Sequence, residues 1–276
     1  MSIAQRAQDR RQAGNSRGRD GSEDSGAKEY AATLAKGLSV LAAFSRERPS
    51  MSLSEAAACV GLSRATARRL LRTLTSLGYV AQDGRRFSLA PRILELGFAY
   101  LSTQSWIERA EPLMKELSHA LQESCSIAIL EGAEIVYLAR AAAPHRIMST
   151  TISIGTRLPA FHTSLGRAQL GFLPENVLVD MLKAMPLAPY TANTIVDRAA
   201  LVARIEADHV EGFSIVDEEL EKGLRSIAVP ILTRAGDCIA AINLSAHSNR
   251  TTRNEMRERF LPRLRDVAES IARTLP

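Results

Sequence analysis

The segment over residues 52–89, SLSEAAACVGLSRATARRLLRTLTSLGYVAQDGRRFSL, constrains the fold of this chain more than any other. Ser52 and Glu55 fit a capping box at the start of a short helix. Gly61 suits the left-handed residue that ends a helix, and Ser63 is suited to cap the next one. The segment therefore predicts two helices joined by a tight turn, which is the pattern of a helix-turn-helix.

The second of these helices, predicted over residues 64–77, has an apolar face and a cationic face. At about 100° per residue, the leucines fall on one arc and the arginines on the opposite arc. A solvated helix face would normally include Glu to pair with Arg four residues away. No acidic residue lies between Arg64 and Gly78. The apolar arc consists of Ala67, Leu70, Leu71, Leu74 and Leu77, and the cationic arc consists of Arg64, Arg68, Arg69 and Arg72.

Residues 79–89 predict two short strands about an Asp83-Gly84 turn, a hairpin that would serve as a wing. Arg85 and Arg86 beside its tip would lie near backbone phosphates or reach a minor groove. Residues 63–92 contain seven Arg and one acid, a net charge of +6, whereas the whole chain carries +5. The basic charge is therefore local, which predicts double-stranded DNA as a partner.

The residues near the start of the second helix of such a motif read base edges in the major groove. A dimer would present two of these helices to the half-sites of a palindromic operator. We expect the base-edge contacts to come from Ser63, Arg64, Thr66, Arg68 and Arg69, and the phosphate contacts from Arg72, Arg85 and Arg86.

Composition indicates an ordinary two-domain protein. The three cysteines, Cys59, Cys125 and Cys238, have no metal-ligand spacing and indicate buried thiols in a reducing compartment. No run approaches the roughly 18 apolar residues of a membrane span, and the N-terminus lacks the apolar region of a signal peptide. We expect a soluble, cytoplasmic protein with no cofactor, no metal and no membrane partner.

The chain divides by composition into four parts. Polar and small residues dominate the N-terminus, which predicts disorder. From about Tyr30 a helix is expected, with Leu34, Leu38, Leu41 and Phe44 on one face. The expected parts are a disordered tail over 1–28, a winged helix-turn-helix domain over 29–90, a linker helix over 91–105 and a second domain over 106–276.

Helices and strands alternate in the second domain in an order that predicts the α+β class. An antiparallel sheet flanked by helices fits this order better than a βαβ repeat. Strands are expected over 126–130, 134–140, 147–154, 213–216, 226–231 and 238–245, and helices over 107–122, 165–173, 174–184, 199–211 and 252–275.

A turn over 155–159 leads to Thr163 and Ser164, which open one of these helices. Hydroxyls and free amides at a helix N-terminus suit a carboxylate. The ordinary alternative is that either hydroxyl only caps the helix.

Further polar side chains would lie beside this turn, since residues two apart in a strand share a face. Ser226, Asn243 and Ser245 would add hydrogen-bond donors from adjacent strands. Met148 and Phe161 would supply an apolar wall. Arg146 would either clamp the ligand or lie at a surface or interface, and Arg140 is a weaker candidate for the same clamp.

The chain from about Thr33 resembles the IclR family of bacterial transcription regulators, and within it the group that controls the β-ketoadipate pathway and related aromatic catabolism. The resemblance covers about 240 residues. It rests on LSEAAACVGLSRATARRLLRTLTSLGYV, RIMSTTISIGTRLPAFHTSLGRAQL from Arg146, GFSIVDEELEKGLRSIAVPI from Gly212 and CIAAINLSA from Cys238.

The resemblance implies a winged helix-turn-helix domain joined to a GAF-like effector-binding domain, in a homodimer or homotetramer. The implied effector is a small carboxylate or aromatic acid. Some relatives carry an acid where this chain has Val216, so the effector here is expected to be larger or less hydroxylated. The family's pocket positions map onto Thr163, Ser164, Leu165, Ser226, Asn243 and Ser245.

Other functions stay open at this point. The effector of such a regulator would alternatively be a short keto acid or a sugar acid. A DNA-binding protein that ignores small molecules is another reading. A catalytic second domain would need a nucleophile and a base such as Ser164 and His162, but no GxSxG or HExxH motif is present. We expect no enzyme.

Overall fold

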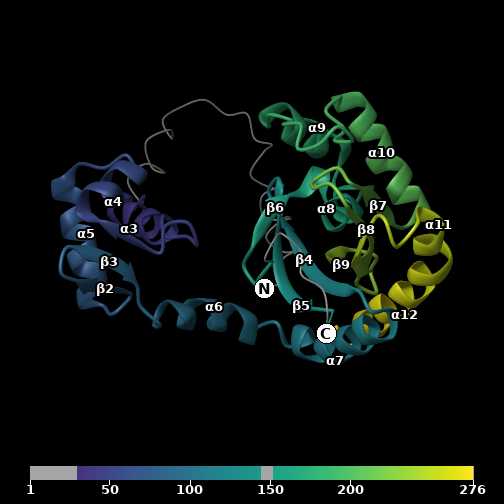
Figure 1. Cartoon of the computed structure of the whole chain (residues 1–276), viewed down its shortest axis with the longest axis horizontal. Helices are drawn as coiled ribbons and strands as arrows, with labels where there is room; N and C mark the ends of the chain where they lie inside the picture. The colour runs from purple at the N-terminus through teal and green to yellow at the C-terminus, as the bar shows by residue number, and fades with distance from the viewer. Residues whose placement is uncertain (1–29, 144–151, 276) are drawn as a thin grey trace, which may run out of the picture. The chain divides into compact units, whose positions relative to one another are not determined.

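The computed structural model describes residues 30–143 and 152–275 (Figure 1). These residues form two compact units that are divided between Thr103 and Gln104. The predicted tail over 1–28, and the effector candidates Arg146 and Met148, lie outside the described residues.

The N-terminal unit contains the predicted winged helix-turn-helix. Its strands form an antiparallel sheet of order β1-β3-β2, in which β1 is a strand that the sequence analysis did not predict. The wing is the hairpin of β2 and β3, which turns at Gly84 with a φ of 54°. The elements are α3 (Ala32–Ala42), β1 (Ser50–Ser52), α4 (Leu53–Cys59), α5 (Arg64–Ser76), β2 (Val80–Asp83), β3 (Arg86–Leu89) and α6 (Ile93–Ser102).

The capping residues expected from the sequence set the ends of α4 and α5. The Glu55 N–H donates to Ser52 Oγ at 3.3 Å, and the Ser52 N–H donates to Glu55 Oε2 at 2.6 Å. Gly61 has a φ of 64°, and the Thr66 N–H donates to Ser63 Oγ at 3.2 Å. The predicted helix-turn-helix is therefore confirmed in its turn as well as in its helices.

Three residues of the predicted apolar faces of this unit are exposed. Leu34 and Leu38 on α3 are 64% and 53% exposed, whereas Leu41 and Phe44 of the same predicted face pack in the core. Leu77 is 50% exposed, because α5 ends at Ser76 and Leu77 begins the turn into the wing. The rest of the apolar arc of α5 is buried: Ala67, Leu70, Leu71 and Leu74.

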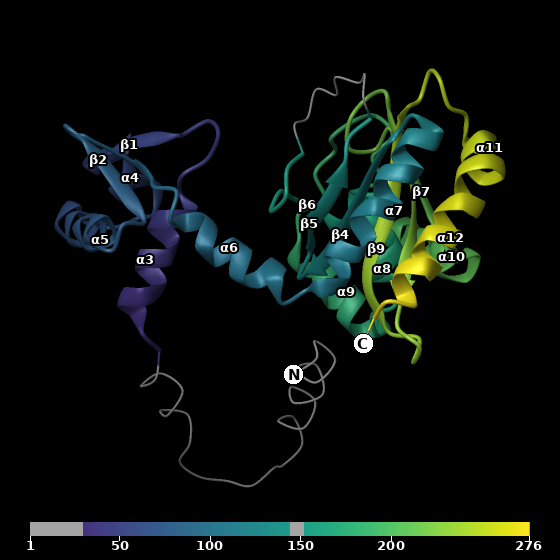
Figure 2. The same ribbon diagram turned by 90° about the horizontal axis from the view of Figure 1, so that it is seen from below.

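The C-terminal unit is built on a six-stranded antiparallel sheet of order β6-β5-β4-β9-β8-β7. One face carries α7 and α12, and α8 packs against the other face (Figure 2). The α+β class expected from the sequence is confirmed. The strands are β4 (Ser124–Glu131), β5 (Glu134–Ala141), β6 (Arg157–Pro159), β7 (Ser214–Asp217), β8 (Leu224–Leu232) and β9 (Cys238–His247).

The helices of this unit follow the predicted order, but the last one is interrupted. A turn of π-helix separates α11 from α12, which has Pro262 in its first turn, where a missing N–H costs least. The helices are α7 (Ser105–Leu121), η1 (Ala160–His162), α8 (Ser164–Leu170), α9 (Glu175–Ala184), α10 (Arg198–Glu211), α11 (Arg253–Glu255), η2 (Met256–Phe260) and α12 (Leu261–Ala272).

The strand predicted over 147–154 differs from the structure. Residues 147–151 lie outside the described residues, and residues 152–154 form no strand. The chain turns at Gly155, which has a φ of 84°, and then forms β6, in which Leu158 pairs with Ile135. The segment over 157–159 was predicted as a turn because a strand of three residues is too short to show an alternating pattern, and its pairing with β5 is seen only in the structure.

Candidate functional site

The outer face of α5 carries exposed guanidinium groups. None of them forms an ion pair with a carboxylate within residues 30–143 or 152–275. Because the helix lacks acidic residues, this face presents unpaired positive charge to solvent, as binding of phosphates requires. The exposed arginines of this face are Arg64, Arg68, Arg69 and Arg72.

The two hydroxyls at the start of α5 are engaged with each other. Ser63 Oγ caps the helix and lies 2.9 Å from Thr66 Oγ1. Ser63 is exposed and Thr66 is half-buried. The contacts of both residues with base edges stay predictions. Each hydroxyl would have to bond a base while keeping its hydrogen bond at the start of α5.

The two arginines of the wing have different surroundings. Arg86 Nε donates to Ser50 Oγ at 2.9 Å, Arg86 Nη2 donates to Ser50 O at 2.6 Å, and Arg86 Nη1 lies 3.7 Å from Glu55 Oε2. Arg85 is exposed, and no described carboxylate pairs with it. Arg86 therefore ties the wing to β1 and α4, which leaves Arg85 as the freer cation.

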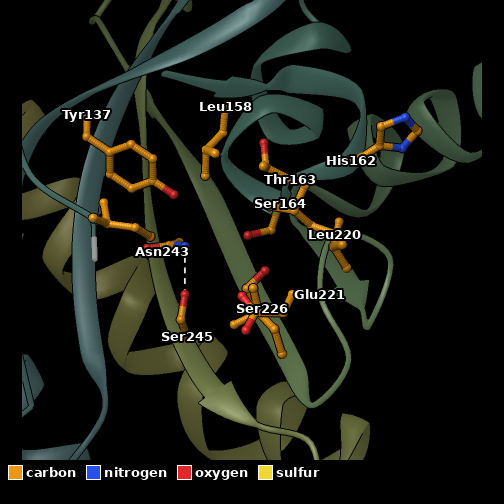
Figure 3. A pocket seen from close by; sticks show the side chains of 13 residues that line it. Tyr137, Leu158, His162, Thr163, Ser164, Leu220, Glu221, Ser226, Asn243 and Ser245 are labelled. Carbon is orange, nitrogen blue, oxygen red and sulfur yellow. Dashed lines mark hydrogen bonds between the residues drawn. The ribbon is translucent and has the colours of Figure 1, made fainter. Parts of the chain in front are cut away.

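A narrow pocket, partly open to solvent, lies in the C-terminal unit (Figure 3). It is bounded by the junction of η1 and α8, by β5, β7, β8 and β9, and by the loop between β7 and β8. Its lining consists of Tyr137, Ile152, Leu158, His162, Thr163, Ser164, Val216, Leu220, Glu221, Leu224, Ser226, Asn243 and Ser245.

Five of the residues expected to bind an effector line this pocket: Thr163, Ser164, Ser226, Asn243 and Ser245. Their effector contacts stay predictions, but the fold brings them together from three separate parts of the chain.

Leu165 and Phe161 lie elsewhere. Both side chains are fully buried in the core cluster between α8 and the sheet and do not line the pocket. The apolar lining is provided instead by Ile152, Leu158, Val216, Leu220 and Leu224.

The strand residues form one polar patch. Ser226 on β8 lies directly opposite Ser245 on β9, and Asn243 lies two residues along β9 on the same face. Asn243 Nδ2 donates to Ser245 Oγ at 3.1 Å, as the dashed line in Figure 3 marks. The sheet therefore presents two hydroxyls and an amide to the pocket side by side.

Thr163 and Ser164 have different tasks. Thr163 Oγ1 accepts from the Gly166 N–H at 3.1 Å and donates to Ala160 O at 3.3 Å, so it caps α8. Ser164 Oγ is buried without a hydrogen-bond partner. The ordinary capping interpretation holds for Thr163, and Ser164 is the hydroxyl available to a ligand.

Unpartnered polar atoms gather at this pocket. Five buried side-chain polar atoms lack a partner in the described part of the chain, and three of them belong to pocket residues: His162 Nδ1, Ser164 Oγ and Asn243 Oδ1. Buried polar groups in proteins are nearly always hydrogen-bonded, so such a gathering indicates a binding site.

The two aromatic titratable residues of the lining are both expected to be uncharged at neutral pH. Burial, with the neighbouring Arg167 cation, lowers the pKa of His162 below its ordinary value, although Glu219 partly opposes this. Burial raises the pKa of Tyr137 to about 12. The Tyr137 hydroxyl points toward Asn243 (Figure 3).

The loop between β7 and β8 was missed as part of the site. It is anchored by hydrogen bonds from Thr191 Oγ1 to Glu218 O and from Thr194 Oγ1 to Glu219 O, both at 2.6 Å. Glu218 adopts a φ of 56°. This anchoring brings Leu220 to the pocket, and no local sequence pattern marks it. Val216 was singled out in the sequence, and it lies in the lining.

The described residues show no catalytic constellation. His162 Nδ1 and Ser164 Oγ both lack partners, so they do not form the hydrogen bond of a base and a nucleophile. No group of three or more His, Cys, Asp or Glu in this part of the chain is placed to hold a metal ion. Nor does the described chain contain a helix long and apolar enough to span a membrane.

Two family models match this chain. The model of the IclR helix-turn-helix domain matches residues 33–84, and that of the bacterial transcriptional regulator IclR C-terminal matches residues 98–273. The Pca regulon regulatory protein of Pseudomonas putida is 39% identical over 247 residues, which span 90% of this chain and 85% of the relative.

Solved structures agree with this likeness. A transcriptional regulator of Rhodococcus sp. RHA1 is 43% identical with a TM-score of 0.77, covering 88% of this chain and 98% of that one. A double mutant of the inducer-binding domain of the PobR transcription factor from Acinetobacter, in complex with 3-hydroxybenzoic acid, is 28% identical with a TM-score of 0.56. That match covers 60% of this chain and 96% of the domain.

Proposed function

The chain belongs to the IclR family of bacterial transcriptional regulators, and from that premise we propose that a small organic acid in the pocket of the C-terminal unit controls binding of the N-terminal unit to a palindromic operator. The protein binds the operator as a homodimer, or as a homotetramer built from such dimers. Residues 91–105, which include α6, link the two domains.

The observation that carries this proposal is the set of unpartnered atoms in the pocket. His162 Nδ1, Ser164 Oγ and Asn243 Oδ1 are buried, and all three belong to residues that line one cavity. Leaving a buried polar atom unpaired costs about 1–3 kcal/mol. A ligand with polar groups at two ends and an apolar middle would satisfy Ser164 Oγ and Asn243 Oδ1 and fill the apolar lining.

The chemical class of the ligand follows from the lining and from the relatives. Leu158, Val216 and Leu220 suit an aromatic ring or a short aliphatic chain, and the hydroxyls beside them suit a carboxylate or a phenol. The related PobR domain was solved with 3-hydroxybenzoic acid. We therefore favour an aromatic acid or a dicarboxylic acid of aromatic catabolism over a short keto acid or a sugar acid.

DNA recognition is assigned to α5 and the wing. Arg64, Arg68 and Arg69 read base edges together with Ser63 and Thr66, and these contacts depend on the sequence of the operator. Phosphates are held by Arg72, Arg85 and Arg86, of which Arg86 also anchors the wing.

Control requires that the acid bind one arrangement of the dimer better than another, because a ligand with equal affinity for both shifts nothing. The acid makes different contacts with the pocket in the two arrangements. The arrangement that the acid favours sets the spacing of the two α5 helices.

A Ser164→Ala variant tests this function. The full-length protein is titrated with 4-hydroxybenzoate, protocatechuate, β-ketoadipate and pyruvate, and the unfolding temperature is followed, since a ligand of the folded state raises it. At least one acid should stabilise the unaltered protein, and Ser164→Ala should need about tenfold more of it. Ser270→Ala is the matched control, because Ser270 lies on α12, away from the pocket lining, and its hydroxyl bonds only the neighbouring helix residues Asp266 and Arg273.

Stabilisation by none of these acids would overturn the effector part of the proposal and favour a regulator that ignores them. Hydrolysis of generic esters by the unaltered protein, lost in Ser164→Ala, would instead support a catalytic domain.

A further inference from the structure

Arg140 on β5 is a half-buried guanidinium with no carboxylate partner among residues 30–143 and 152–275. Its two side-chain contacts, Nη1 to Ser126 Oγ and Nη2 to Ser124 Oγ, are both 3.5 Å long, at the outer limit of a hydrogen bond. Burial lowers the pKa of Arg140, and the groups that oppose this are Tyr137 and Cys125. Burial raises the pKa of both of these groups, so both are neutral at pH 7.

Its lack of a partner sets Arg140 apart from the other arginines that the described residues bury or half-bury. Each of the others has a carboxylate: Arg167 pairs with Glu219, Arg204 with Asp208 and Arg225 with Asp217. Removing a cation from water without an anion is costly, so proteins rarely leave one in this state.

A β-bulge aims Arg140 at the ligand face of the sheet. Ile127 pairs with Ala139, but its neighbour Ala128 pairs with Tyr137, so Leu138 is an extra residue in β5. Without this bulge, Tyr137 and Arg140 would point to opposite faces, because side chains alternate along a strand. With it, Tyr137 opposite Ala128 and Arg140 opposite Ser126 both face the α8 side. Bulges of this kind commonly re-aim a functional side chain.

The register places Arg140 beside the polar patch of the pocket. Arg140 lies opposite Ser126, and Ser126 lies opposite Asn243 on the next strand. Ser124 lies opposite Ser245 in the same way. The guanidinium contacts Ser124 and Ser126 on β4, and the next strand, about 5 Å away, carries Asn243 and Ser245. A continuous polar row therefore leads from Arg140 to the pocket.

We propose that Arg140 binds the carboxylate of the effector, at the end of the site away from α8. This rests on the proposed function and deepens it: the effector is an organic acid whose carboxylate lies over β4, in reach of Asn243 and Ser245. Its opposite end carries a hydroxyl or keto group that meets Ser164. A guanidinium suits this role because it donates two parallel hydrogen bonds to a carboxylate.

The orientation differs from the one expected from the sequence, in which the carboxylate would lie at the start of α8. One of the free amides at the start of α8 is already satisfied, because the Gly166 N–H donates to Thr163 Oγ1. The helix is also only seven residues long. The sheet end of the site holds the cation.

The test compares Arg140→Met with the unaltered full-length protein by calorimetric titration with 4-hydroxybenzoate, protocatechuate and β-ketoadipate. The variant should bind the acid about 10–100-fold more weakly, because it loses a charge-assisted, two-pronged contact. For each benzoate the matching carboxamide is titrated as well, and its affinity should change less than threefold. Arg157→Met is the matched control: Arg157 is exposed, pairs with Glu131 and Glu134, and should leave all affinities unchanged.

A second readout separates ligand binding from a structural role. Because no described carboxylate pairs with Arg140, Arg140→Met should unfold without ligand at the same temperature as the unaltered protein, or at a higher one. A clear fall in that temperature together with unchanged affinity for the acid would overturn the proposal. If the Met variant does not fold, Arg140→Lys is used in its place. It should bind the acid several-fold more weakly, because an ammonium cannot donate two parallel hydrogen bonds to a carboxylate. Unchanged affinity of Arg140→Lys for the acid would also overturn the proposal.

The outcomes distinguish this inference from the function on which it rests. If the unaltered protein binds none of the acids, both fail. If it binds an acid and Arg140→Met binds it equally well, the effector proposal stands and only the assignment of Arg140 fails.

Discussion

The guanidinium of Arg167 on α8 is buried against the carboxylate of Glu219, with Nη1 donating to Oε1 at 2.8 Å. Arg167 Nε also donates to Phe161 O at 2.8 Å. The pair therefore joins η1, α8 and the loop between β7 and β8, three segments that together form one side of the pocket.

Arg167→Met should lower the free energy of unfolding of the C-terminal unit by about 3–5 kcal/mol, because it leaves the Glu219 charge buried and unpaired. Urea unfolding at neutral pH measures this. The double variant Arg167→Met/Glu219→Met should recover most of the loss. Arg157→Met, which breaks an exposed pair, should cost less than about 1 kcal/mol. Equal losses for the buried and the exposed pair would contradict the account.

Gly166 marks a close approach that no other residue tolerates. A Cβ at this position would lie 2.1 Å from Ala160 O, so Gly166→Ala must push α8 away from η1. We expect a loss of roughly 3 kcal/mol or more, judged by the cost of overpacking, and a weaker response to the effector. Gly97→Ala on α6 meets no atom within 4 Å and should leave the unfolding temperature unchanged or slightly raised. A Gly166→Ala protein as stable as the unaltered one would be inconsistent with this packing.

His162 should make stability depend on pH. Its pKa is lowered in the folded protein by burial and by Arg167, so the folded state binds fewer protons than the unfolded state. Stability is then complete above the ordinary value of 6.5 and falls as the pH drops below it, until the folded pKa is passed. Unfolding by urea at pH 7.5 and 5.5 measures this fall, which should be smaller in His162→Gln. An identical fall in the two proteins would show that His162 does not contribute.

Arg68 and Arg85 should affect DNA binding in different ways. Arg68→Ala should cost about 1–3 kcal/mol on the operator and relax its sequence preference, whereas Arg85→Ala should weaken all sequences alike and reduce the salt slope by about one. Fluorescence anisotropy on operator and unrelated duplexes at several salt concentrations measures both effects. Arg109→Ala, an exposed arginine on α7, controls for the loss of one charge. Equal, small losses at Arg68 and Arg85 would argue against the division of roles.

The sequence predicted those parts of the fold that depend on local signals. The ends of α4 and α5 follow from Ser52, Gly61 and Ser63, whose capping and backbone preferences act within a few residues. Leu34 and Leu38 share a predicted face with Leu41 and Phe44, but only the latter two pack in the core, because periodicity does not say how far along a helix the core extends.

The site was predictable only in part, for a related reason. Ser226 and Ser245 could be paired because strand alternation places them, and Ser164 because it opens a helix. Arg140 ranked only as a weak candidate, because strict alternation would put it on the face opposite Tyr137, and the bulge at Leu138 appears only once β4 and β5 are paired. Leu220 reaches the pocket through an anchored loop that depends on Thr191, about 30 residues away.

The most direct test of the central claim is the affinity of the purified protein for a palindromic promoter fragment and for random duplex DNA of equal length, at about 150 mM salt, with and without the acid that stabilises it. The account predicts that the palindrome is bound at least about a thousandfold more tightly, and that the acid changes this affinity in the unaltered protein much more than in Ser164→Ala. Equal affinity for palindrome and random duplex, or an operator affinity that no bound acid alters, would contradict it.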